Sequence, residues 1–235
     1  MTKQQSETPA SLAIAKNETA TEAIQAIQTP QVTASANGAK SSRLTIPDLI
    51  SIGVFTVLYF LCVGVATFLS ALVAGFGTIF LPAVAALICG IVYMLSVARV
   101  GKFGGITVMG VVIGLFLFVS GHFALSFVAS LVFPLAADLI ARAGKYQSKA
   151  GILASYVVFC YGLTGPILPL WFMKDAYVAS LQARGKDAAY IDGLFSQINT
   201  GSFFLAMGAI LVCALIGGWF GQRIVAKHFV KAGIV

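Results

Sequence analysis

The sequence predicts an all-α polytopic membrane protein with six transmembrane helices, and three observations carry that prediction. No charged side chain occurs from Leu49 to Ala98 or from Phe103 to Ala137. The chain is 59% hydrophobic and only 10% charged, with a mean hydropathy of +0.94, whereas a soluble domain is about 25% charged. Basic residues gather in alternate connections between the apolar stretches. Because a charge at the centre of a membrane helix costs roughly 2.5–3.5 kcal/mol, such stretches are typical of lipid-embedded helices.

Six apolar segments follow one another along the chain, and a bilayer crossing takes about 20 residues. The predicted spans are 49–69, 78–98, 105–120, 122–141, 151–173 and 200–221, with a turn near 71–77 and a long polar loop at 174–199. Residues 1–43 contain no Phe, Trp or Tyr and are rich in Ala, Thr, Gln and Ser. That composition cannot bury enough apolar surface to fold alone. We therefore expect a disordered cytoplasmic tail over 1–43 and a six-helix transmembrane domain over 44–235.

The basic residues orient these spans. One side of the predicted membrane carries Arg43, Arg99, Lys102, Arg142, Lys145, Lys149, Arg223, Lys227 and Lys231. The other side carries Lys174, Arg184 and Lys186, which are balanced by Asp175, Asp187 and Asp192. The positive-inside rule then places both termini in the cytoplasm. This bias accounts for the net charge of +7, and no basic stripe with interleaved aromatics indicates a nucleic-acid partner.

Small residues at helical spacing predict close packing between the spans. Gly110 and Gly114, Gly217 and Gly221, and Ala86 and Gly90 each lie four positions apart, a pattern that lets helix backbones approach one another. We expect packing within the chain rather than a dimer interface. The four cysteines lie singly in apolar runs without C-x-x-C spacing, so we expect small apolar core residues and no metal or redox site.

Asp138 is the acidic residue inside a predicted span, and Arg142 follows it by four positions. Residues at that spacing share a helix face, so a structural ion pair between them is expected. A proton relay is the alternative, because polar groups at membrane depth are default site candidates. It is disfavoured because no second acidic group lies at depth to receive the proton.

His122 lies at the outer turn between two predicted spans. It could ligate a metal or haem-like centre, hydrogen-bond a ligand, or simply sit at the lipid headgroups. Ser120 is adjacent, but no Gly-x-Ser-x-Gly elbow and no His-Glu-x-x-His motif occurs, and neighbours on one turn do not form a nucleophile–base pair. We expect no enzyme, no catalytic residue and no resident cofactor.

The segment from Tyr161 to Met173 holds Pro166 and Pro169, which break the helical hydrogen-bond ladder. Freed carbonyl groups at membrane depth must be buried in protein or line a cavity. The aromatic side chains Tyr161, Trp171 and Phe172 flank this break, and span six opens with hydrogen-bonding residues, namely Gln197, Asn199, Thr200 and Ser202. The sequence therefore predicts an outward-facing pocket. A kinked helix with Trp171 in the interfacial aromatic belt is the alternative.

Several blocks together resemble the Trep-Strep, or MptD, family of proposed substrate-binding (S) components of energy-coupling factor (ECF) transporters. They are LTIPDLISIGVF (44–55), GKFG (101–104), SGH (120–122), ADLI (137–140), GKYQS (144–148) and GPILPLWFMKDAY (165–177). No nucleotide-binding Gly-x4-Gly-Lys-Ser/Thr loop occurs. This is consistent with a subunit that depends on partners for energy.

The resemblance implies a six-helix importer module in a prokaryotic cell membrane that captures a micronutrient, such as a vitamin, a metal chelate or a tetrapyrrole-like ligand. A separate transmembrane coupling subunit and two ATPase subunits would supply the work. Small residues on the first helix would dock the coupling subunit, and this chain offers Ser51, Gly53 and Thr56 there. The ligand would lie among His122, Tyr161, Trp171, Phe172, Asn199 and Ser202. The alternatives are a ligand-free membrane scaffold and a stand-alone ion-coupled carrier.

Overall fold

The computed structural model describes residues 43–72 and 77–229, and over these residues the chain is helical without a β-strand. The chain divides into two units between residues 41 and 42, and the described residues belong to the second. The helical content confirms the all-α class. The predicted tail over 1–43 lies outside the described residues apart from Arg43, so it stays a prediction.

The first described helix, α2 (Ile46–Ala71), contains the first predicted span. It begins where the Thr45 backbone N–H and hydroxyl donate to the Asp48 carboxylate at 2.8 and 2.7 Å. A carboxylate at this position satisfies groups that the first helical turn leaves unpaired. One stripe of the helix is buried, namely Ile52, Thr56, Tyr59, Ala66 and Ser70. The opposite face is apolar and exposed, as expected of a helix between a protein core and lipid.

The second predicted span forms as two helices, α3 (Gly77–Ile88) and α4 (Gly90–Val100), bent by 48° at the break between them. Gly90 lies at this break, where a Cβ atom would overlap the carbonyl group of Gly217. Glycine permits both the bend and the close approach of two backbones.

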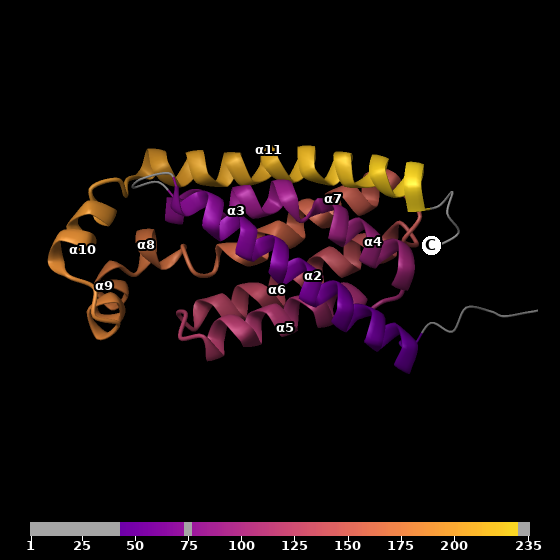
Figure 1. Cartoon of the computed structure of the whole chain (residues 1–235), viewed down its shortest axis with the longest axis horizontal. Helices are drawn as coiled ribbons and strands as arrows, with labels where there is room; N and C mark the ends of the chain where they lie inside the picture. The colour runs from indigo at the N-terminus through magenta and orange to yellow at the C-terminus, as the bar shows by residue number, and fades with distance from the viewer. Residues whose placement is uncertain (1–42, 73–76, 230–235) are drawn as a thin grey trace, which may run out of the picture. The chain divides into compact units, whose positions relative to one another are not determined.

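Helices α5 (Gly105–Val119) and α6 (Leu125–Ala143) form the predicted hairpin (Figure 1). A Cβ atom added at Gly110 would overlap the ring of Pro134, and one at Gly114 would lie 2.7 Å from the Ser130 Cβ. The glycine pattern therefore packs helices within the chain, as predicted.

The fifth predicted span is interrupted where its prolines fall. Helix α7 (Lys149–Cys160) passes into a 3-10 turn, η1 (Tyr161–Thr164), and α-helix resumes only in the short α8 (Pro169–Phe172). Proline has no backbone N–H to continue the ladder, so the break predicted from the sequence is present.

The predicted polar loop at 174–199 contains two helices, α9 (Lys174–Ala183) and α10 (Ala188–Phe195). Their buried residues pack in a second hydrophobic cluster, formed by Ile167, Leu170, Leu181, Ile191 and Leu194. The loop interpretation was wrong in this respect. Helices α9 and α10 have only 10 and 8 residues, too few for hydrophobic periodicity to reveal them.

The last long helix, α11 (Thr200–Ile224), begins at Asn199, whose side-chain oxygen accepts the Ser202 backbone N–H at 2.9 Å. A π-helical turn, η2 (Val225–Phe229), follows it. Helix α11 packs along α3, α4 and α7, and a Cβ atom at Gly221 would lie 2.6 Å from the Gly90 carbonyl oxygen.

Fewer helices are long enough to cross a membrane than the six predicted. Three stretches pass by length and composition, Ile46–Ala71, Leu125–Ala143 and Thr200–Lys227, and the bent α3–α4 pair makes a fourth if it counts as one span. Gly105–Val119 and Lys149–Thr164 are apolar but shorter. The described residues thus show three to four candidate spans and do not confirm six.

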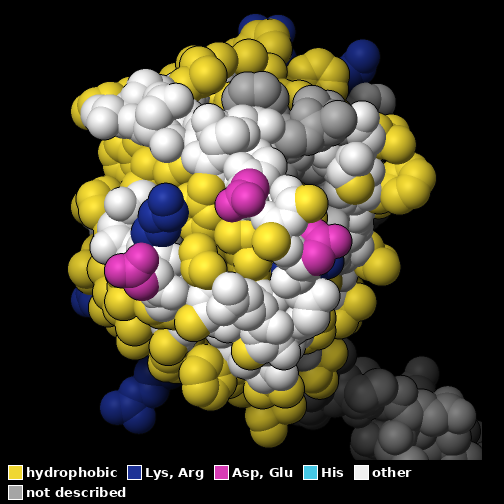
Figure 2. Space-filling model, turned by 90° about the vertical axis from the view of Figure 1, so that its left-hand side faces the viewer, with side chains coloured by type: hydrophobic (Ala, Val, Ile, Leu, Met, Phe, Trp, Pro, Cys, Tyr) yellow, Lys and Arg dark blue, Asp and Glu magenta, His cyan; other side chains and the backbone are white. Residues whose placement is uncertain are grey.

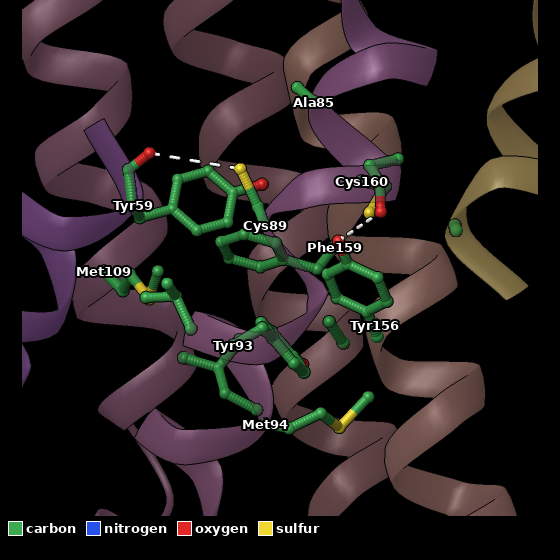
Figure 3. Close-up of a cluster of buried hydrophobic side chains, with 14 of the residues drawn as sticks. Tyr59, Ala85, Cys89, Tyr93, Met94, Met109, Tyr156, Phe159 and Cys160 are labelled. Carbon is green, nitrogen blue, oxygen red and sulfur yellow. Dashed lines mark hydrogen bonds between the residues drawn. The ribbon is translucent and has the colours of Figure 1, made fainter. Parts of the chain in front are cut away.

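The core between α2, α4 and α7 is built from aromatic side chains (Figure 3). Tyr59 meets Phe159 edge to face at 5.6 Å between ring centroids, and Tyr93 lies 4.9 Å from Tyr156. The Tyr93 hydroxyl is 2.6 Å from the Ser155 hydroxyl, and the Tyr156 hydroxyl donates to the Ala86 carbonyl at 2.6 Å. The hydroxyl groups of Tyr93 and Tyr156 therefore have hydrogen-bond partners inside the apolar core. Cys89 and Cys160 are buried in the same cluster as free thiols.

Candidate functional site

Four of the six predicted site residues come together where α8 meets the start of α11. The Trp171 indole N–H donates to the Asn199 carbonyl at 3.1 Å and lies 3.4 Å from the Ser202 hydroxyl oxygen. Trp171 and Phe172 both pack edge to face on Phe203, at 5.5 and 5.6 Å between ring centroids. The polar atoms of this group are occupied by one another, so the cluster fastens α8 to α11.

The other two predicted site residues lie apart from that group. Tyr161 packs beside Phe133 and donates its hydroxyl to the Met207 carbonyl at 3.0 Å. His122 lies in the α5–α6 turn, half-buried, with its Nδ1 3.2 Å from the Leu117 carbonyl oxygen. The structure therefore does not gather the six residues into one pocket.

The α5–α6 turn is tied to α9. The Arg184 guanidinium, at the end of α9, donates to the Gly121 carbonyl. Partial burial lowers the pKa of His122, and the nearby positive charge of Arg184 lowers it further. Among the described residues no three His, Cys, Asp or Glu side chains converge to hold a metal ion.

A cavity of about 550 Å³ lies elsewhere, between the end of α2, the start of α3 and α10. Its lining comes from both sides: Thr67, Ser70, Ala71, Gly77, Thr78 and Leu81 from α2 and α3, and Ala189, Tyr190, Gly193, Leu194 and Gln197 from α10 and the turn after it. None of the six predicted site residues lines it. Figure 2 shows the end of the molecule that carries α9 and α10, where scattered charged side chains surround an apolar centre.

The predicted residues support the wall of this cavity. Leu194 lines the cavity and belongs to the second hydrophobic cluster, against which Trp171 packs. Trp171 in turn is hydrogen-bonded to the start of α11. The predicted site residues Trp171 and Phe172 therefore do not line the cavity, and Trp171 supports the helix that does, α10.

Sequence reasoning missed the cavity because it followed charged and aromatic residues. Thr67 and Ser70 precede the first turn and Thr78 follows it, so three hydroxyl groups flank that turn in an otherwise apolar stretch. These hydroxyl groups were the sequence signal for the α2 and α3 side of the cavity. No sequence signal indicated the α10 side, because α10 itself was not predicted to be a helix.

The expected ion pair between Asp138 and Arg142 does not form. The fully buried Asp138 carboxylate accepts the Gly104 and Thr107 backbone N–H groups at 2.8 and 3.1 Å and the Thr107 hydroxyl at 2.8 Å. The N-terminus of a helix attracts a carboxylate in this way, and here it is that of α5. Arg142 instead lies over the Phe103 ring, 4.9 Å from its centroid.

Tyr146 completes the Asp138 site from the α6–α7 connection. Its hydroxyl donates to the Asp138 carboxylate at 2.7 Å. Burial raises the pKa of Tyr146, and the hydrogen bond to Asp138 raises it further. Nearby, Lys102 pairs with Asp48 at 2.6 Å, the ion pair that the described residues form. These contacts tie α2, α5, α6 and the α6–α7 connection together at the basic end.

The three residues expected to dock a coupling subunit do not share one surface. Gly53 is exposed, and a Cβ atom added there would meet nothing within 4 Å. Thr56 is buried and donates to the Ile52 carbonyl at 2.7 Å, whereas Ser51 is half-buried and donates to the Pro47 carbonyl. Only Gly53 of the three lies on the open face of α2.

Comparison with known proteins identifies the family. No curated protein and no solved structure matches the chain. A family model described as "hypothetical bacterial integral membrane protein (Trep_Strep)" matches residues 46–231, which include every described helix from α2 to α11. The chain belongs to the Trep_Strep family of bacterial integral membrane proteins.

Proposed function

We propose that the chain is the substrate-capture (S) component of an ECF-type importer in the bacterial cell membrane. The observation that carries this proposal is the cavity of about 550 Å³ between α2, α3 and α10. It has the size of a small-molecule site, about 300–1,000 Å³, and a mostly apolar lining with a few polar groups. The helices that line it, α10 and the end of α2, lie at the end opposite the basic connections and the start of α2 (Figure 1). The family resemblance of the sequence points to the same function.

The proposed topology has six crossings with both termini in the cytoplasm. The bent α3–α4 pair counts as one crossing, and α7, η1 and α8 together count as another, interrupted by its prolines. Helix α5 is short, and its hairpin partner α6 shields one side of it. The positive-inside rule supports the orientation, because the basic connections lie at one end and α9 and α10 at the other. The cavity then faces the outside of the cell.

Partners would supply the energy in this proposal. A transmembrane coupling subunit and two ATPase subunits would bind the chain, which itself would catalyse no reaction. The exposed face of α2 around Gly53 offers an apolar, side-chain-free spot where another helix can approach closely. The coupling subunit would dock there.

Reconstitution tests the proposal. The chain is expressed with the coupling subunit and ATPases of a bacterium that encodes a Trep_Strep protein, purified by a tag on the chain, and placed in proteoliposomes. The expected result is a stoichiometric four-subunit complex and uptake that requires ATP. Uptake by the chain alone would instead indicate an ion-coupled carrier. Isolation with unrelated partners and without uptake would indicate a scaffold.

A further inference from the structure

We propose that the end of α11 binds the headgroup of an anionic phospholipid, with Arg223 and Lys227 holding its phosphate. The inference concerns the outer surface of the protein, so it stands independently of the cavity and of the proposed function. It gives a binding partner to basic residues that the sequence explained only by their bias toward one side of the membrane.

One exposed stripe runs along α11 and changes from apolar to basic near its end. Arg223 and Lys227 are exposed and lie four positions apart. The exposed apolar residues that precede them on the same face are Val212, Ile216, Trp219 and Phe220. Residues three or four positions apart are neighbours on a helix surface. An apolar face that ends in basic side chains is typical of the boundary between the hydrocarbon core and the lipid headgroups.

Trp219 marks the level of that boundary on α11. Exposed indole rings gather at the membrane–water interface, because they combine an apolar body with a polar N–H. Arg223 lies four residues further along, about 6 Å on the helix axis. The stretch Thr200–Lys227 is a candidate span of 28 residues, and a crossing takes about 20. Its last turns, with Arg223 and Lys227, therefore reach the phosphate groups of the lipids.

The Arg223 guanidinium is positioned there and keeps its donors available. Its central carbon lies over the Trp219 ring, 4.5 Å from the ring centroid. Within the described part of the chain, no hydrogen bond or ion pair engages its N–H groups. A guanidinium presents a planar fork of donors that matches phosphate oxygens, whereas a lysine ammonium adds a flexible point charge. Arg223 and Lys227 therefore offer two complementary contacts to one phosphate.

The surroundings of this site are positively charged. Four more basic side chains are exposed at the same end of the molecule, namely Arg99, Arg142, Lys145 and Lys149. The start of α7 lies beside the end of α11, because the Gln222 side chain donates to the Lys149 carbonyl at 2.7 Å. The turn η2, which contains Lys227, packs on α4 (Figure 1). Basic residues of three helices thus surround the end of α11.

The described acidic residues at this end do not neutralise that charge. Asp48 is paired with Lys102 at 2.6 Å. Asp138 is fully buried and surrounded by hydrogen-bond donors. An anion that approaches from outside therefore meets an excess of positive charge. A lipid is favoured over an acidic protein, because one lipid molecule can lay its acyl chains along the apolar part of the stripe and its phosphate on the basic part.

The opposite end of the molecule provides a matched control. Lys174 and Lys186 also lie over aromatic rings, at 5.1 and 4.8 Å from the ring centroids. Three acidic residues accompany them on α9, on α10 and between these helices: Asp175, Asp187 and Asp192. Replacing these two lysines by glutamine removes as much charge as replacing Arg223 and Lys227, but leaves the proposed site intact.

The experiment measures how strongly lipid stabilises the full chain in detergent. Wild type, R223Q/K227Q and K174Q/K186Q each receive phosphatidylglycerol or phosphatidylcholine with the same acyl chains. The shift in Tm is taken against each protein's own Tm without lipid, so an effect of the substitutions on stability does not count as binding. We expect phosphatidylglycerol to shift wild type and K174Q/K186Q about threefold more than phosphatidylcholine does, since basic residues near an anionic headgroup attract it. R223Q/K227Q should lose that difference.

Several outcomes would overturn the proposal. They are equal shifts with the two lipids, an unchanged phosphatidylglycerol shift in R223Q/K227Q, and an equal loss in K174Q/K186Q. A shift of the same size with inorganic phosphate alone would indicate a free-anion site rather than a lipid site. Loss of a co-purifying acidic protein from R223Q/K227Q, with its lipid shift intact, would assign the surface to that protein. Raising the salt concentration should reduce the phosphatidylglycerol shift of wild type, because salt screens exposed charges, and a salt-independent shift would contradict the phosphate contact.

Discussion

Glycines in two regions of this molecule have opposite surroundings, crowded in one and open in the other. Along the seam between α3–α4 and α11, Gly90, Gly217 and Gly221 each lie so close to the opposite backbone that a Cβ atom would collide with it. At the cavity between α2, α3 and α10, a Cβ atom added to Gly193 would meet nothing within 4 Å. The same residue type thus lies both where two backbones are crowded together and where the space beside it is open. The spacing of glycines along the sequence does not distinguish these two environments. It shows where two helix backbones can approach each other, but not whether they do.

The two regions also differ in whether their buried polar atoms have hydrogen-bond partners. Near the basic end, the Asp138 carboxylate is surrounded by donors from α5 and Tyr146. At the cavity, Ser70 and Gln197 each keep a buried oxygen without a partner. A satisfied polar network stabilises a fixed arrangement, whereas a buried polar atom without a partner costs free energy. We infer that the packed part serves as frame and the end that carries the cavity as receptor.

The largest expected effect comes from breaking the glycine seam. Gly217→Leu forces a side chain into the backbone of α3, where the Ala86 and Leu87 carbonyls lie. Overpacking against backbone cannot be relieved by a rotamer change, so we expect a loss of at least about 3 kcal/mol in unfolding free energy. Unfolding in SDS measured by circular dichroism checks this. Gly208→Leu is the control, and a similar loss there would contradict the distinction between the two glycine environments.

The next effect comes from the buried carboxylate of the frame. Asp138→Asn replaces an acceptor of four hydrogen bonds by an amide whose NH₂ group would face donors. Because hydrogen bonds to charged groups contribute about 1.5–3 kcal/mol, we expect a loss of about 2–3 kcal/mol. Arg142→Gln should have a much smaller effect, since no ion pair joins it to Asp138. Equal losses in the two variants would restore the ion-pair interpretation.

A smaller effect is expected where frame and receptor join. Trp171→Phe keeps a ring beside Phe203 but removes the indole N–H that donates to Asn199. We expect about 1 kcal/mol less stability and weaker retention of the molecule bound in the cavity, because α10 loses part of its support. Thermal unfolding and ligand retention are measured together. Tyr161→Phe serves as the comparison, and unchanged retention in Trp171→Phe would separate this cluster from the cavity wall.

The smallest effect concerns pH at the α5–α6 turn. Burial holds the pKa of His122 below its usual value of about 6.5, so the unfolded chain takes up a proton more readily than the folded one. The contribution of His122 to stability is therefore present above about pH 6.5 and is lost as the pH falls from there toward the lower folded value. Unfolding of wild type and His122→Gln at pH 7.5 and 5 tests this. The drop should be smaller in the variant, and an equal drop would assign it to other groups.

The sequence anticipated several particular features. The absence of charge from Leu49 to Ala98 indicated membrane helices, and the paired prolines indicated the break after α7. The small-residue spacing indicated close packing within the chain, which the structure places between α5 and α6 and between α3–α4 and α11. These features are local, or depend on a repeat along one helix. The cavity was not anticipated, because it needs α10 opposite the end of α2 and the start of α3. That pairing joins segments more than a hundred residues apart in the chain, and local pattern carries no information about it.

The sequence by itself determined that this is a helical membrane protein, because solvation by lipid excludes charge from long stretches whatever their packing. It also indicated the break after α7, since a proline removes its hydrogen bond within one turn of its own position. Only the tertiary structure decided that Asp138 binds the start of α5 rather than Arg142 and that Trp171 supports a wall rather than facing a ligand. It likewise decided that Ser70 and Gln197 border one cavity. The physical reason is that a polar group takes the partner that folding brings nearest, and distance along the chain does not fix that partner.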